Sequence, residues 1–170
     1  MLILKVFILF GIIGISAQIG IMKSKTYKYR LEELQEIKNS LNIFKTKIKF
    51  TYEPIPEIFE NIANNTENKK IGEMFRKSAE DMNFLSAGEA FNKNVDQSET
   101  YLVDEDKKAV KTLSKLLGKT DIEGQISEIE LTQTYLDEQI QKAKETKNKN
   151  EKLYKTMGIV IGLAIAIILV

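Results

Sequence analysis

Each end of this 170-residue chain is an apolar segment without charge, and every acidic residue lies between the two segments. The first segment, residues 6–22, has 17 uncharged residues, and the second, residues 157–170, has 14. A helix needs about 20 mostly apolar residues to cross a bilayer. The second segment approaches this length when the helix begins a few residues earlier and Lys155 extends its charge to the headgroups. The sequence therefore predicts transmembrane helices at residues 1–22 and 157–170, with a charged domain at residues 23–156 between them.

Basic residues stand on the inner side of both apolar segments. They are Lys23, Lys25, Lys28 and Arg30 after the first segment, and Lys149, Lys152 and Lys155 before the second. Because basic flanks stay on the cytoplasmic side of a membrane, both flanks predict one topology, with both chain ends outside and residues 23–156 in the cytoplasm. The same residues are also suited to bind anionic lipid headgroups, although topogenic charge alone explains them.

Each end also has another interpretation. Residues 1–20 have the length of a cleaved signal peptide, but cleavage would place the charged domain outside, against its basic flanks. Residues 157–170 have the length of a buried core helix, but they lack the polar stripe that such a helix normally shows. We therefore expect both ends to span the membrane.

The composition limits the chemistry of the chain. There is no Cys and no His, which excludes disulfides, thiolate or imidazole metal sites and Ser-His-Asp catalysis. Residues 23–156 have no net charge, unlike a typical nucleic-acid-binding domain. The acids at residues 104–106 could bind a divalent cation weakly, but they also begin a predicted helix, where they favour the helix dipole. We predict no enzymatic activity, no cofactor and no small-molecule substrate.

The middle of the chain is almost continuously compatible with helices. A seam of apolar residues at heptad spacing consists of Tyr27, Leu31, Leu34, Ile37, Leu41, Phe44 and Ile48. It predicts one helix that continues the first apolar segment and stops before Pro54. Residues 47–52 alternate like a strand, but no second strand is present to pair with them.

Five further helices follow from breaks, caps and apolar faces. Helices are expected at residues 55–63 and 69–85, the second with Ile71, Met74, Phe75, Ser78, Met82 and Leu85 on one face. Ser86 and Glu89 form a capping box for a helix through Val95.

Asp104 can cap the next helix, which ends at Gly118 and points Val110, Leu113, Leu116 and Leu117 inward. Thr120 and Glu123 form a second capping box. It begins a long helix with Ile122, Ile126, Ile129, Leu136 and Ile140 inward.

These elements predict an all-α fold, an antiparallel bundle of about six helices between an N-terminal and a C-terminal transmembrane helix. The heptad seam could instead form a parallel coiled coil between chains. The short connections favour the bundle.

Small residues recur in both apolar segments. The second has Gly158, Gly162 and Ala166 at four-residue spacing, and the first has Gly11, Gly14, Ala17 and Gly20 together with polar Ser16 and Gln18. Such residues let membrane helices approach closely, but glycine is also common in membrane helices without this role. Gln18 favours an interface, because an amide without a partner is unfavourable in lipid.

Several short patterns, taken in order, resemble one protein family. Leu117, Gly118, Asp121 and Gln125 match an LG-x-[ST]-D-x-x-x-Q run, and Lys152-Leu-Tyr precedes the second apolar segment. Together with the prolines at 54 and 56, this order is similar to that of the stage III sporulation protein AB family, over essentially the whole chain. The chain departs from the family at Phe59-Glu60, where Ala-Leu is common, and at Ala90-Phe91, where a Trp often lies. Asp121 beside Gln125 marks either a partner contact or helix capping, and capping explains the pair better.

The resemblance implies a membrane protein of endospore-forming bacteria, acting between mother cell and forespore with its helical domain in the mother-cell cytoplasm. That domain looks like the cytoplasmic domain of the inner-membrane platform protein of type II secretion. The implied partners are other stage III sporulation proteins, including a cytoplasmic secretion-type ATPase, and the membrane. The expected function is therefore a non-enzymatic membrane scaffold.

The alternative is a dimerising membrane sensor or regulator that signals through the heptad seam. The seam separates the two hypotheses, because a seam buried inside one chain supports the scaffold and an exposed seam paired between chains supports the regulator.

Overall fold

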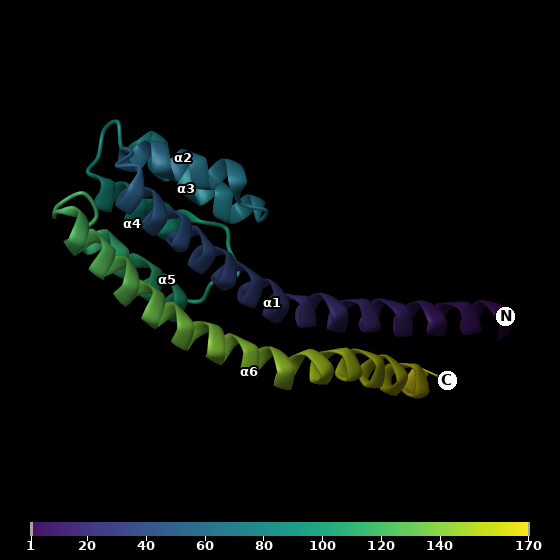
Figure 1. The fold of residues 1–170 in the computed structure, drawn as a ribbon. Helices are drawn as coiled ribbons and strands as arrows, with labels where there is room; N and C mark the ends of the chain where they lie inside the picture. Colours follow the sequence, from purple (N-terminus) through teal and green to yellow (C-terminus); the bar gives the residue numbers. More distant parts are fainter. Residues whose placement is uncertain (1, 170) are drawn as a thin grey trace. The chain divides into compact units, whose positions relative to one another are not determined.

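The computed structural model describes the backbone of residues 2–169 and the side chains of residues 7 and 9–169. Met1 and Val170, the outermost residues of the two predicted spans, lie outside the described residues. Within them the chain forms six α-helices, one short 3₁₀ helix and no strand, so the all-α prediction is confirmed (Figure 1). The elements are α1 (Leu2–Phe50), α2 (Ile55–Asn65), α3 (Lys69–Asp81), α4 (Ala87–Gln97), α5 (Asp104–Lys111), the 3₁₀ helix η1 (Thr112–Lys115) and α6 (Ile122–Leu169).

The chain divides into two compact units. The terminal pair joins Met1–Leu31 to Lys142–Val170, and the bundle is Glu32–Gln141. Both α1 and α6 contribute to both units without a break. The helix that was predicted to continue the first apolar segment is therefore present as one element.

The bundle is built around the heptad seam of α1. Leu34, Ile37, Leu41 and Phe44 are completely buried, and Ile48 is 4% exposed. The seam residues of the bundle are thus enclosed within one chain, as the antiparallel bundle requires, and they do not form an exposed coiled-coil face.

Four phenylalanines from four helices form the centre of this core. Phe59 of α2 lies at the middle, with ring centroids 5.4 Å from Phe44, 5.1 Å from Phe75 and 5.5 Å from Phe91. All three contacts are edge-to-face, the arrangement that aromatic quadrupoles prefer. A single side chain thus joins α1, α2, α3 and α4.

Within the bundle, polar pairs fix the antiparallel register of α1 and α6. Lys38 bonds to Asp137 at 2.5 Å, Gln133 donates to Asn42 at 2.8 Å, and Lys45 bonds to Glu130 at 3.2 Å. As the residue number rises along α1, the residue number of the partner falls along α6, as in an antiparallel pair. A slip by one residue would separate all three pairs.

The buried face of α6 is more polar than expected. Ile129 and Leu136 are completely buried as predicted, but Ile122, Ile126 and Ile140 are only half-buried. The stripe is completed by Gln125, Glu128, Thr132 and Gln139. Burial of these polar side chains is compensated in part by local hydrogen bonds, such as Thr132 to the carbonyl oxygen of Glu128 at 2.8 Å.

Two helix ends differ from the prediction, and the difference exposes two leucines. Helix α3 ends at Asp81, so Leu85 lies in the following turn and is 38% exposed. Helix α5 tightens into η1 after Lys111. Because a 3₁₀ helix has about 3.0 residues per turn, the inward face shifts, and Leu116 is 40% exposed while Leu113 and Leu117 stay buried.

The N-terminal cap of α4 was predicted correctly, whereas at α5 and α6 a different residue from the predicted one forms the cap. Ser86 and Glu89 form the expected capping box of α4. At α5 the carboxylate that bonds to the preceding backbone is Asp106, which accepts from the N–H of Val103 at 3.0 Å, and Asp104 is not the cap. At α6 the cap is Asp121, which accepts from the N–H of Gly124 at 2.9 Å, so the predicted box from Thr120 is wrong.

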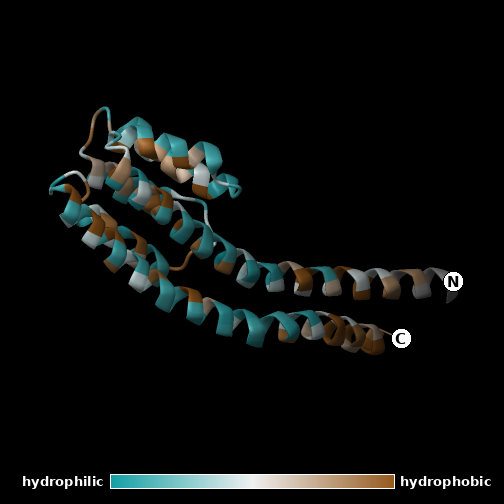
Figure 2. Ribbon diagram, in the orientation of Figure 1, coloured by the Kyte–Doolittle hydropathy of each residue, from teal (hydrophilic) through white to brown (hydrophobic). Residues whose placement is uncertain are grey.

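Among the described residues, α6 is the helix that is long and apolar enough to cross a membrane. Figure 2 shows the last turns of α6 as almost wholly hydrophobic. One spanning helix is thus supported by length and composition, whereas the first predicted span at residues 1–22 stays a prediction.

Candidate functional site

Small residues bring the two helices of the terminal pair into backbone contact. The hydroxyl of Ser16 donates to the carbonyl oxygen of Gly158 at 2.7 Å. A Cβ atom added at Gly20 would lie 2.5 Å from the carbonyl oxygen of Tyr154, and one added at Gly158 would lie 2.8 Å from that of Ser16. Only glycine fits at these two positions, because the neighbouring atoms belong to backbone and cannot rotate away.

The contact continues towards the chain ends. A Cβ atom at Gly162 would lie 3.0 Å from the Cα atom of Ile13, and one at Gly158 would lie 3.3 Å from the Cα atom of Ala17. Ala166, one turn further along α6, is 8% exposed. Ala17, Gly20, Gly158 and Gly162 therefore share one contact face, with Ala166 buried in line with it.

The remaining small and polar residues of the first segment lie elsewhere. A Cβ atom at Gly11 or Gly14 would meet nothing within 4 Å, and the side chain of Gln18 is exposed. An α-helix has about 3.6 residues per turn, so Gly11, Gly14 and Gln18 occupy a different face of α1 from Ser16 and Gly20. Sequence spacing divides the small residues between two faces, but it could not show which of the faces packs against α6.

A tyrosine stack lies among the basic residues of the terminal pair. The rings of Tyr27 and Tyr154 are 5.7 Å apart with an interplanar angle of 29°. The basic residues predicted to flank the spans are exposed at Lys23, Lys25, Lys28, Lys149, Lys152 and Lys155, and half-buried at Arg30. Lys155 bonds to Glu151 at 2.8 Å and holds the pKa of that carboxyl below its usual value. Aromatic rings next to basic residues are typical of the membrane–water interface.

The residues of the family pattern build the turn that begins α6. Leu117 is buried, and Gly118 adopts a φ of +73°, a conformation that favours glycine at a helix C-terminus. Asp121 caps α6, and the side-chain nitrogen of Gln125 donates to the carbonyl oxygen of Thr120 at 3.2 Å. Capping and turn formation thus account for this pattern without a bound partner.

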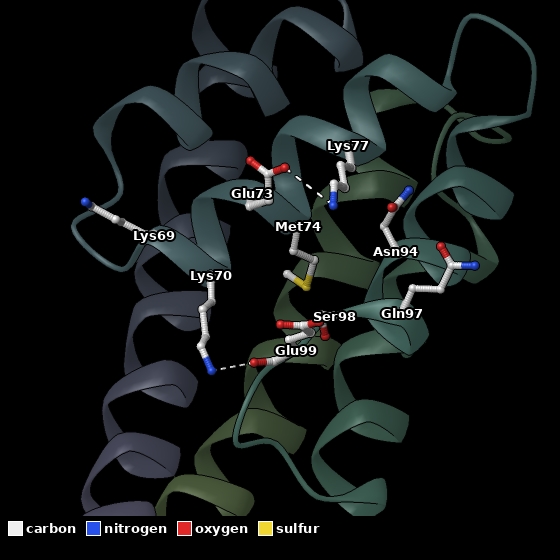
Figure 3. Close-up of a pocket in the computed structure, with 9 residues that line it drawn as sticks. All are labelled: Lys69, Lys70, Glu73, Met74, Lys77, Asn94, Gln97, Ser98 and Glu99. Carbon is white, nitrogen blue, oxygen red and sulfur yellow. Dashed lines mark hydrogen bonds and ion pairs between the residues drawn. The ribbon is translucent and has the colours of Figure 1, made fainter.

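A polar groove between α3 and α4 was not predicted. It has a volume of about 480 Å³ and is lined by Lys69, Lys70, Glu73, Met74, Lys77, Asn94, Gln97, Ser98 and Glu99 (Figure 3). Lys70 donates to the carbonyl oxygen of Glu99 at 2.5 Å, and Lys77 pairs with Glu73 at 3.5 Å. Two helices and a loop share the lining, so no local sequence pattern marks it.

A buried glutamate holds the loop between α4 and α5. Glu33 of α1 is 1% exposed and accepts a hydrogen bond from the N–H of Tyr101 at 2.6 Å. Burial raises the pKa of Glu33 to about 7, with the nearby carboxylates of Asp106 and Glu32 acting in the same direction and the N–H of Tyr101 and the ammonium of Lys70 acting against it. Lys70 also lies 4.3 Å from the centroid of the Tyr101 ring. The charged sequence around Glu33 gave no signal of its burial.

The raised pKa of Glu33 predicts a pH-dependent stability. An unfolded glutamate has its ordinary pKa of 4.5, whereas folded Glu33 titrates at about 7. The stability that protonated Glu33 contributes is fully present below the pKa of the unfolded state. It is lost as the pH rises through the pKa of the folded state. In Glu33→Gln the amide oxygen can still accept from Tyr101, and no charge is buried. We expect the variant to gain stability relative to wild type from about pH 5 to about pH 8.

Urea unfolding at a series of pH values measures this difference. Between pH 4.5 and about pH 7, the difference in the free energy of unfolding should change by at most about 1.4 kcal/mol per pH unit. A difference between variant and wild type that does not change with pH would contradict the assignment.

No group of three or more Asp or Glu residues suited to hold a metal ion occurs in the described part of the chain. The acids at residues 104–106 were a weak candidate for a divalent cation. Asp106 is completely buried and bonds to the backbone of Val103. Its carboxylate thus has a structural role at the start of α5.

Comparison with known proteins adds to this geometry. The chain matches the family model of stage III sporulation protein AB over residues 5–170. It is also similar to a solved structure of stage III sporulation protein AB (SpoIIIAB), with a TM-score of 0.65 and 18% identity. The similarity covers 71% of this chain and 97% of the solved chain, and it shows a shared fold. No curated protein matches the chain.

Proposed function

Because this chain belongs to the stage III sporulation protein AB family, we propose that it is a non-enzymatic membrane scaffold of the sporulation complex that links mother cell and forespore. Family membership indicates a component of a sporulation complex. The observation that carries the scaffold role is the terminal pair, in which Ser16, Gly20 and Gly158 bring two apolar helices into backbone contact. A close helix pair of this kind is a means of fixing a protein in a bilayer.

In this proposal both apolar ends cross the membrane. Helix α6 meets the requirements of length and hydropathy, and residues 6–22 of α1 are uncharged. The basic residues that follow the first span and precede the second keep residues 23–156 in the mother-cell cytoplasm. The contact face of Gly20, Gly158 and Gly162 joins the two spans.

The second face of the first span, with Gly11, Gly14 and Gln18, would contact membrane helices of partner proteins. A glutamine amide in hydrocarbon favours a hydrogen-bonding neighbour. The bundle would present its surface, including the groove between α3 and α4, to cytoplasmic partners. By similarity to a secretion platform protein, we propose that a cytoplasmic secretion-type ATPase of the same sporulation group is one of them.

The alternative function, a dimerising sensor or regulator, required an exposed seam. Because Leu34, Ile37, Leu41 and Phe44 are completely buried within one chain, the structure favours the scaffold.

Affinity purification of the tagged full-length chain from sporulating cells tests the proposal. We expect other stage III proteins to be recovered with it, and chemical crosslinks to the ATPase to fall in residues 23–156. Recovery of the chain alone, or only as a symmetric dimer, would contradict the scaffold.

A further inference from the structure

An apolar groove runs along one side of the terminal pair. Its volume is about 540 Å³. Ser16, Gly20 and Gly158 are among the residues that line it. Because these side chains are small and the two backbones touch there, they leave a floor that larger side chains would fill.

Large apolar side chains form the two walls. On α1 the wall consists of Ile12, Ile15 and Ile19, and on α6 it consists of Met157, Ile161 and Ile165. Residues three, four or eight apart lie on the same side of a helix, so each wall is continuous. The walls are also open to the surroundings, since Ile15 and Ile19 are 65% and 63% exposed.

At one end, its mouth, the groove meets an exposed lysine. Lys23 and Tyr154 line it there, beside the predicted cytoplasmic boundary. Ile12 and Lys23 lie eleven residues apart, which corresponds to about 17 Å at about 1.5 Å per residue. This is close to half of the roughly 30 Å hydrocarbon thickness, so the groove has the depth of one leaflet.

We propose that this groove binds one acyl chain of an anionic phospholipid from the cytoplasmic leaflet, with Lys23 contacting its phosphate. The inference rests on the proposed placement of both terminal helices in the membrane. An acyl chain matches the apolar walls and the depth, and the cation at the mouth complements the headgroup charge. A helix of the same length would occupy roughly 1,300 Å³ from its diameter of about 10 Å, so it could lie across this groove but not enter it.

The test uses the full-length chain reconstituted in nanodiscs of equal parts phosphatidylcholine and phosphatidylglycerol. After extraction into mild detergent, the phospholipids retained by the protein are counted by native mass spectrometry. We expect wild type to retain phosphatidylglycerol in preference to phosphatidylcholine. Lys23→Gln should lower that preference about fivefold, the effect of one lysine near an anionic surface.

Two further variants separate the groove from general surface charge. Lys25→Gln removes the same charge from an exposed residue that does not line the groove, and it should lower the preference less than Lys23→Gln does. Ile161→Trp fills the groove from one wall and should lower retention of both lipids. Equal retention of the two lipids by wild type, or equal effects of Lys23→Gln and Lys25→Gln, would overturn the proposal.

The result is independent of the scaffold test. If the wild-type chain recovers its partner proteins but retains the two phospholipids equally, the lipid site alone is overturned. Retention of phosphatidylglycerol by a chain that recovers no partner would support the lipid site and contradict the scaffold.

Discussion

Replacing Phe59 by alanine is expected to lower the free energy of unfolding of the bundle by about 3–5 kcal/mol, the usual loss for a phenylalanine deleted from a core. Phe59 is completely buried and makes edge-to-face contacts with Phe44, Phe75 and Phe91. The cavity would open at the point where four helices meet. Urea unfolding of residues 24–155, followed by circular dichroism, measures the loss.

Phe84→Ala is the matched control for this prediction. Phe84 is 90% exposed in the turn after α3, so the same atoms are removed where they bury little surface. We expect a change within about 0.5 kcal/mol, as for most surface substitutions. Similar losses for Phe59→Ala and Phe84→Ala would mean that the aromatic cluster does not hold the bundle together.

Replacing Gly158 by leucine is expected to separate the two helices of the terminal pair and to reduce recovery of the assembled complex. Even a Cβ atom at this position would lie 2.8 Å from the carbonyl oxygen of Ser16 and 3.1 Å from the Cα atom of Gly20. A larger apolar side chain cannot replace contacts made by two backbones. Gly158 lies outside the bundle, whose core is within Glu32–Gln141. The stability of the bundle should therefore change little in this variant.

Ile159→Leu provides the comparison, since this neighbour of Gly158 has a side chain that is 49% exposed and keeps its size in the substitution. It should leave the terminal pair intact. The measurement is the amount of complex recovered in mild detergent from cells expressing each variant. Equal recovery for Gly158→Leu and wild type would show that close packing at this glycine is dispensable for assembly.

Local signals in the sequence were sufficient to place most helices. Pro54 marks the end of α1, Ser86 and Glu89 cap α4, and Gly118 adopts the positive φ expected of a helix terminus. These signals act over a few residues and depend little on tertiary context.

Features that depend on packing were not accessible in the same way. Leu116 was expected inside, but the chain tightens into η1 just before it, and a change of helical period cannot be read from apolar spacing. Glu33 belongs to none of the apolar patterns of the sequence, yet it is buried against the loop at Tyr101. Gln125 and Glu128 belong to the buried stripe of α6, which a pattern built only from apolar residues omits.

The two departures from the family pattern are related in the structure. Phe59 and Phe91 were recognised separately as positions where the family usually has other residues. Their rings are 5.5 Å apart in an edge-to-face contact. The two positions thus belong to one core, a relation that becomes visible only when α2 and α4 are placed side by side.

Cysteine labelling tests whether two membrane spans hold residues 23–156 in the cytoplasm, because the native chain has no cysteine. One variant carries Asn92→Cys, at an exposed position of α4, and another carries a cysteine added before Met1. In intact vegetative cells expressing the chain in the plasma membrane, a membrane-impermeant thiol reagent should label the added cysteine and leave residue 92 unlabelled until the cells are opened. Labelling of residue 92 in intact cells, with protection of the added cysteine, would contradict the cytoplasmic placement of residues 23–156.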